Sequence, residues 1–148
     1  MKKYIFLVWI MTIFKCFAQD GDLNMSIIAH VQGNGSGIWH YLGKNGIEYA
    51  AMGYTDALVI YSLEDPSKPI ERFRFPGVNT IWREVFFYGE YIYAVTDSKS
   101  DGVIIINMKQ APTKITGKFW SPTVTANNIT KVLSTCHTVF VDEKGILS

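Results

Sequence analysis

The chain has 148 residues and a formal net charge of +1, and 48% of its residues are apolar, 18% charged and 14% aromatic. This composition is typical of a globular protein with one packed core and excludes an intrinsically disordered chain.

Residues 1–19 have the pattern of a secretory signal peptide. Lysines precede an apolar run of about a dozen residues, and small residues follow at Cys16 to Ala18, where a signal peptidase cleaves. The run is shorter than the roughly 20 residues that span a bilayer, so we expect cleavage after Ala18 or Gln19 and no membrane span in the mature chain. The segment removes three lysines and no acid, which leaves a net charge of about −2. We therefore expect an extracellular or cell-surface location and no nucleic-acid partner.

Cys136 is the only cysteine that follows this segment. An exported chain with one thiol has no internal disulfide, so its stability must come from packing. We expect Cys136 to be buried, which is the common fate of a lone cysteine beside apolar residues, or to be available to a partner.

The first half of the mature chain predicts consecutive strands. Met25 to Val31 has strand composition and ends at a glycine-rich stretch, Gly33 to Gly37. Its G-x-G-x-G pattern is a weak match to a phosphate loop because no Lys-Ser/Thr follows, so we predict a flexible surface turn. Asn45-Gly46 predicts a type I′ hairpin turn. Four strand-like runs with turn signals between them predict an antiparallel meander: 38–42, 47–53, 57–63 and 70–75.

The segment from Ile81 to Phe119 repeats this pattern, and Cys136 to Leu147 begins it again. The recurring residues are Ile38-Trp39 as Ile81-Trp82, Glu48-Tyr49 as Glu90-Tyr91, Leu58-Val59-Ile60 as Val103-Ile104-Ile105, and Phe73 as Phe119. A period of about 40–45 residues with four strands and no helix is typical of β-propeller blades. A β-sandwich is the competing interpretation, but it does not require the same residues to recur in the same order. We predict an all-β, propeller-like domain over residues 20–148, with about two complete four-stranded antiparallel blades and the start of a third.

The stretch ALVIYSLEDPSKP, Ala57 to Pro69, looks like the LVIVD repeat. Together with TIWREVFFYGEYIYAV and CHTVFVDEKG, it resembles the amino-terminal part of the choice-of-anchor B family of exported bacterial proteins. The resemblance implies a secreted or surface-displayed propeller with no general catalytic activity. Two blades and part of a third cannot close a ring of four to eight, so we expect a fragment of a longer product or self-association through open blade edges.

Candidate ligand contacts come from one position of the repeat. Trp39, Trp82 and His137 occupy that position, and His40 and Arg83 adjoin it. Equivalent positions form a ring around a propeller axis, and aromatic rings beside an arginine could bind a sugar or a peptide. Packing of these rings against the neighbouring blade is the simpler interpretation, and we favour it. The five residues remain the best candidates for contact with an extracellular protein or glycan.

No pattern in the sequence identifies a catalytic or metal site. Asp97 to Gly102 has the outline of a calcium loop, but Lys99 and Met108 occupy positions that require oxygen ligands. The histidines have no fixed spacing to an acid, and the common hydrolase and metalloprotease motifs are missing from the sequence. We expect a binding or scaffold module without cofactor or metal. The alternative is a propeller-type hydrolase or lyase with its site at the central channel.

Overall fold

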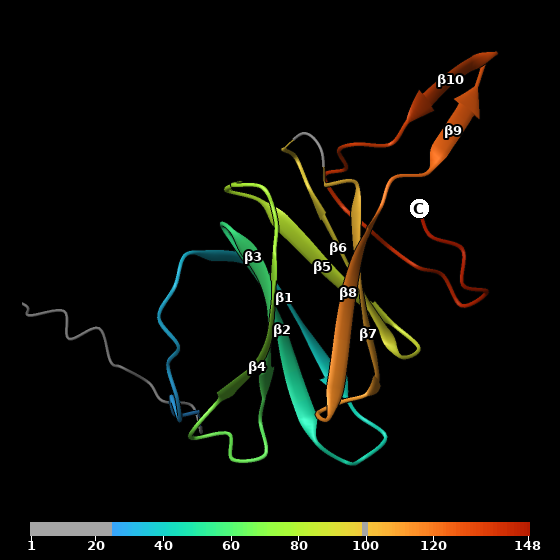
Figure 1. The fold of residues 1–148 in the computed structure, drawn as a ribbon. Coiled ribbons are helices and arrows are strands. Elements are labelled where there is room, and N and C mark those ends of the chain that lie inside the picture. Colours follow the sequence, from blue (N-terminus) through green and yellow to red (C-terminus); the bar gives the residue numbers. More distant parts are fainter. Residues whose placement is uncertain (1–24, 99–100) are drawn as a thin grey trace, which may run out of the picture.

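A computed structural model describes residues 25–98 and 101–148, and this part of the chain is all-β with no helix. The predicted signal peptide and Lys99 lie outside the described residues. Two four-stranded antiparallel meanders, in the orders β1-β2-β3-β4 and β5-β6-β7-β8, confirm the strands predicted between residues 38 and 119, and a β9-β10 hairpin follows (Figure 1). Met25 to Val31 does not form the strand that its composition suggests. The strands are β1 (Gly35–Leu42), β2 (Glu48–Tyr54), β3 (Ala57–Ser62), β4 (Ile70–Pro76), β5 (Arg83–Tyr88), β6 (Tyr91–Thr96), β7 (Val103–Gln110), β8 (Lys114–Trp120), β9 (Thr123–Ala126) and β10 (Ile129–Val132).

The glycine-rich stretch is not the flexible surface turn that its composition predicts. Gly35 and Gly37 lie inside β1, and Gly37 is buried. A Cβ atom at Gly37 or at Gly53 of β2 would collide with the backbone oxygen of Arg83. These glycines are therefore needed because the backbone of β5 passes directly against the first sheet, where only a residue without a side chain fits.

The turn chemistry expected at Asn45-Gly46 is found at another hairpin. Residues 43–47 form a longer connection in which Gly46 has a positive φ of 77° and Asn45 does not. The two-residue turn between β9 and β10 consists instead of Asn127 and Asn128, with φ values of 50° and 61°. Both positions have the positive φ that a type I′ turn requires.

The two meanders pack face to face (Figure 1). Their facing surfaces share one cluster of buried residues, because alternate side chains along each strand point to the same side. The cluster comprises Tyr41, Tyr49, Ala51, Leu58, Ile60, Val85, Ile92, Ala94, Ile104, Ile106 and Met108. Strands β1 and β5 lie beside each other, so the first strands of the two sheets meet along this interface.

The second sheet is covered on one face by the first sheet and over part of its other face by the carboxy-terminal segment. Val95 and Val103 point away from the first sheet and are buried with Val139 from the carboxy-terminal segment. A two-layer sandwich would leave this outer face to solvent. The first sheet also has a second buried cluster on its far face, around Val59 and Tyr61.

The carboxy-terminal segment, residues 139–148, forms a hairpin that we call the third hairpin. Its turn repeats the turn between β1 and β2. Phe140 and Ser148 exchange both backbone hydrogen bonds, at 2.9 and 2.8 Å, and so form an antiparallel pair. The turn between them has bonds from the amide of Asp142 to the oxygen of Ile146 and from Gly145 back to Asp142. Residues 43–47 show the same two bonds, so the first and third repeats share this turn, whereas residues 89–90 form a shorter turn in the second.

A buried ion pair fastens the segment between the sheets. Arg83 is fully buried, and its Nη1 lies 3.2 Å from Asp101 Oδ2. Its Nε donates to the backbone oxygen of Tyr54 at 3.2 Å, and its Nη2 donates to that of Val78 at 2.7 Å. Asp101 Oδ2 also accepts a bond from the Val78 amide at 2.9 Å. The guanidinium therefore has hydrogen-bond partners from both sheets and from the link between them.

Replacing Asp101 with Ala is expected to destabilise the protein strongly. The variant leaves the Arg83 charge buried without its anion, which costs about 3–5 kcal/mol in comparable sites. Arg72→Gln, which breaks the exposed pair with Glu64, is the control and should cost less than about 1 kcal/mol. Urea unfolding of both variants measures the difference. Equal free energies of unfolding for the two would contradict the role given to the buried pair.

Tyr61 should make stability fall at alkaline pH. Burial, and then the 3.0 Å hydrogen bond with Tyr54, raise the pKa of Tyr61 to about 12. A raised pKa means that the folded state retains the proton more tightly, so its stabilising contribution is complete below the unfolded pKa near 10. That contribution is lost as pH rises from about 10 to 12. Unfolding midpoints across this range should fall less steeply in Tyr61→Phe, and identical slopes would be the contrary result.

Candidate functional site

A row of aromatic side chains crosses the three repeats. Trp39 of β1 lies with its ring centroid 4.7 Å from that of Phe86 in β5. Phe86 in turn lies 5.1 Å from Phe140 in the carboxy-terminal hairpin. The separations are those of favourable aromatic pairs, and both Trp39 and Phe140 keep part of their surface exposed.

A second group forms around His137. Its ring is stacked on that of Trp82, with centroids 5.0 Å apart and planes 5° from parallel. Trp82 Nε1 donates to the backbone oxygen of His137 at 3.1 Å, and His137 Nδ1 lies 2.8 Å from Asp97 Oδ1. The imidazole is thus held on one face by an indole and on one edge by a carboxylate. We call Trp39, Trp82, His137 and Phe140 the aromatic surface.

The contact with Asp97 defines what His137 can do chemically. With a proton on Nδ1 directed at the carboxylate, Nε2 has a free lone pair that can accept a hydrogen bond or a proton. Nε2 in this orientation can accept a hydrogen bond from a donor group of a bound ligand. A histidine that acts as a general base has the same orientation. Within residues 25–98 and 101–148, however, no group of three or more histidine, cysteine or acidic residues lies close enough to hold a metal.

The recurrence of Ile-Trp in the sequence does not correspond to one position in the sheets. Trp39 lies opposite Ala51 in the middle of the β1–β2 pair, whereas Trp82 precedes β5. The cause is hairpin length, because residues 43–47 connect β1 to β2 and residues 89–90 connect β5 to β6. Phe86, rather than Trp82, is the residue whose ring packs against Trp39, so the two tryptophans do not occupy equivalent positions in the sheets, although both lie at the surface.

Two of the other candidates lie away from this surface. Arg83 is fully buried in its ion pair and has no exposed atom to offer a ligand. His40 is exposed but points to the opposite face of β1 from its neighbour Trp39. Its Nε2 is 3.9 Å from Glu48, which is a long and exposed pairing. His137 and Trp82 are the predicted pair that the fold brings together.

Sequence reasoning missed Phe86, Phe140 and Asp97. Asp97 is forty positions before His137, and no spacing rule connects an acid in one loop to a histidine in the next repeat. Phe86 and Phe140 each follow a strand pattern that predicts core packing, which partly conceals their role. Trp39, Phe86 and Phe140 lie four, three and two residues before the first residue of their hairpin turns, so no shared position in the repeat signals this contact.

The chain was compared with known protein families, with curated proteins and with solved structures, and no match was found. In the described part of the chain, no helix has the length and apolar character needed to cross a membrane.

Removing the Asp97 carboxylate should loosen the start of the third hairpin. The amide of Cys136 donates to Thr96 at 3.1 Å, directly beside the contact between Asp97 and His137. Exposed pairs contribute less than about 1 kcal/mol, so Asp97→Ala should accelerate hydrogen exchange at this amide by up to about fivefold. Glu48→Ala, which removes the acid beside His40, is the matched control and should leave the rate unchanged. Acceleration in both variants, or in neither, would contradict a local role.

Proposed function

We propose that this protein is an exported binding module with a propeller-like arrangement of four-stranded blades. The order in which the sheets pack supports this arrangement. The first sheet packs against one face of the second, and the third hairpin packs against the other face. Successive sheets that each cover the next are the basis of blade stacking. The segment at residues 1–19 supports export, and the LVIVD-like stretch at Ala57 to Pro69 supports membership of the choice-of-anchor B family.

The observation that carries the binding function is the exposure of the aromatic surface. Trp39 is 40% exposed, Trp82 38% and Phe140 54%, although each is large enough to stabilise a core if buried. Trp39 and Phe140 both pack against Phe86, and Trp82 is stacked on His137, so the surface consists of two aromatic groups. Aromatic side chains with polar neighbours form binding surfaces for sugars and peptides. Nε2 of His137 and the carboxylate of Asp97 would add hydrogen bonds at the edge. The ligand in this proposal is an extracellular protein or glycan.

Substitution of the exposed tryptophans is expected to weaken binding without unfolding the protein. The mature chain is applied to arrays of immobilised oligosaccharides and of extended peptides, and Trp39→Ala and Trp82→Ala are compared with it. Loss of an exposed aromatic contact in a binding site costs about 1–2 kcal/mol or more, so affinity should fall about tenfold. The matched control is Trp120→Ala, which removes a similarly exposed tryptophan from edge strand β8.

Thermal unfolding of each variant separates lost binding from lost structure. A ligand that binds the Trp39→Ala and Trp82→Ala variants as tightly as Trp120→Ala would overturn the assignment of the aromatic surface. Failure of every array member to bind the parent chain would overturn the binding function itself.

A further inference from the structure

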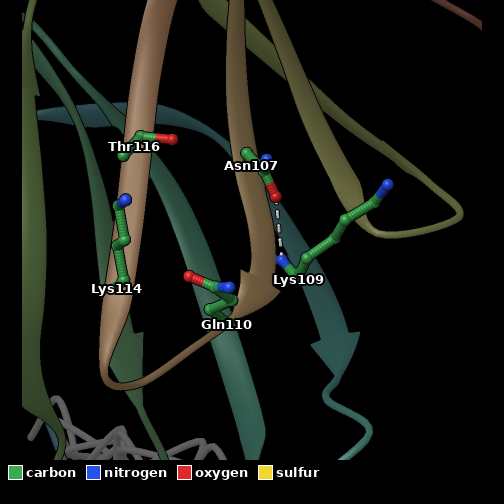
Figure 2. Close-up of a pocket in the computed structure, with 5 residues that line it drawn as sticks. All are labelled: Asn107, Lys109, Gln110, Lys114 and Thr116. Atoms are coloured by element: carbon green, nitrogen blue, oxygen red, sulfur yellow. Dashed lines mark hydrogen bonds between the residues drawn. The ribbon is translucent and has the colours of Figure 1, made fainter.

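A groove with lysines on its walls runs between β7 and β8 on the outer face of the second sheet, the face turned away from the first sheet. It consists of two hollows of about 310 and 260 Å³ that share Asn107 and Thr116. Figure 2 shows these two residues on neighbouring strands, with Gln110 and Lys114 nearer the β7–β8 turn. The ladder is irregular between Asn107 and Gln110. The lysines that line the groove are Lys109, Lys114 and Lys118.

Along the outer face of the second sheet, apolar residues are replaced by polar and charged residues at this groove. In the first sheet, Phe73 is paired with Ile60, and both pack against the second sheet. In the second sheet, the residue paired with Ile105 is Lys118, on the face that turns toward the third hairpin. Burying a lysine under another sheet without a partner would be costly. The polar end of this face therefore suits water or a polar ligand better than another apolar sheet.

The charge of the groove is uncompensated. No acidic residue lines either hollow. Among the described residues, Lys44 and Lys68 lie near carboxylates, at 3.0 and 4.0 Å, whereas none of the three groove lysines has such a partner. Lys109 Nζ lies 5.3 Å from the centroid of the Tyr91 ring, which also lines the groove. An anionic group bound here would meet several cations at once and would displace no existing ion pair.

We propose that this groove binds a segment of an acidic polysaccharide, such as a chain of uronic acids. The lysines would bind the carboxylates, and the side chains of Asn107, Gln110 and Thr116 would exchange hydrogen bonds with sugar hydroxyls. Tyr91 provides an apolar ring at the edge of the groove, against which the C–H face of a sugar can pack. The inference rests on the proposed function as an exported binding module. Single-stranded nucleic acid fits less well because, among the described residues, Tyr91 is the one aromatic residue that lines the groove, whereas proteins bind single strands with several aromatic rings that stack on successive bases.

The test titrates the full mature chain with a short oligogalacturonate and with its methyl ester, which has the same sugar chain without the charges. A variant with Lys109, Lys114 and Lys118 all changed to Gln should bind the oligogalacturonate about tenfold more weakly or worse. Binding to the parent chain should weaken as salt is added, because the charges are exposed. The control changes Lys68, Lys131 and Lys144 to Gln, which alters net charge equally at exposed positions outside the groove. This control should retain the parent affinity.

Two further variants complete the design. Thr116→Val keeps the shape of the side chain and removes its hydroxyl, so it should weaken binding a few-fold while the unfolding curve stays unchanged. Trp82→Ala reports on the aromatic surface in the same titration. If Trp82→Ala loses oligogalacturonate binding while the groove variant retains it, the groove is excluded and the aromatic surface is supported.

Four other outcomes would overturn the proposal. Equal losses in the groove variant and the lysine control would show attraction by net charge alone and would overturn it. Tighter binding of polyglutamate or of single-stranded DNA than of oligogalacturonate would assign the groove to a peptide or nucleic acid instead. Binding of neither the acidic oligomer nor any array oligosaccharide or peptide would reject the groove and the proposed function together. Array binding that survives all groove substitutions, with no oligogalacturonate binding, would reject the groove alone.

Discussion

The contact between the β5 backbone and the first sheet is the constraint on which the packing of the two sheets depends. Gly37 and Gly53 leave room for the backbone oxygen of Arg83, and its side chain then turns into a space that admits no solvent. A buried guanidinium requires an anion and several acceptors, and Asp101, Tyr54 and Val78 supply them. Backbone contact and charge pairing therefore both require that β5 lie close against the first sheet.

The sequence was sufficient to predict the strand order but not the alignment of one sheet with the other. Alternation and turn residues identify each four-stranded meander, since these signals are local. The position of Trp82 was wrong because hairpin length, and not residue identity, determines which residue of β5 faces Trp39. Arg83 resembled a surface cation because nothing near it in the sequence reveals Asp101, which reaches it through the fold. The contact between Asp97 and His137 is likewise a product of tertiary structure.

The two candidate surfaces use the same scaffold in different ways. In the aromatic surface, Trp39 of the first sheet and Phe140 of the third hairpin both pack against Phe86 of the second sheet, so these rings are positioned by packing between repeats. The groove lies between β7 and β8 of a single sheet and is positioned by one ladder. A substitution that shifts one sheet against the other would disturb the first surface and leave the second intact. The stability of the interface between the sheets is for that reason part of the geometry of the aromatic surface.

The two links between repeats differ in whether they contact the buried part of the fold, and the link with the β9–β10 hairpin is the exposed one. Residues 77–82 cross from the first sheet to the second and include Val78, which is bonded to the Arg83 guanidinium, so this link has little freedom to change length. The next link contains the whole hairpin, every residue of which is exposed, and it projects away from both sheets (Figure 1). Surface connections of this kind tolerate insertions and divergence. The second link is therefore the place where this architecture can acquire new segments while the sheets keep their arrangement.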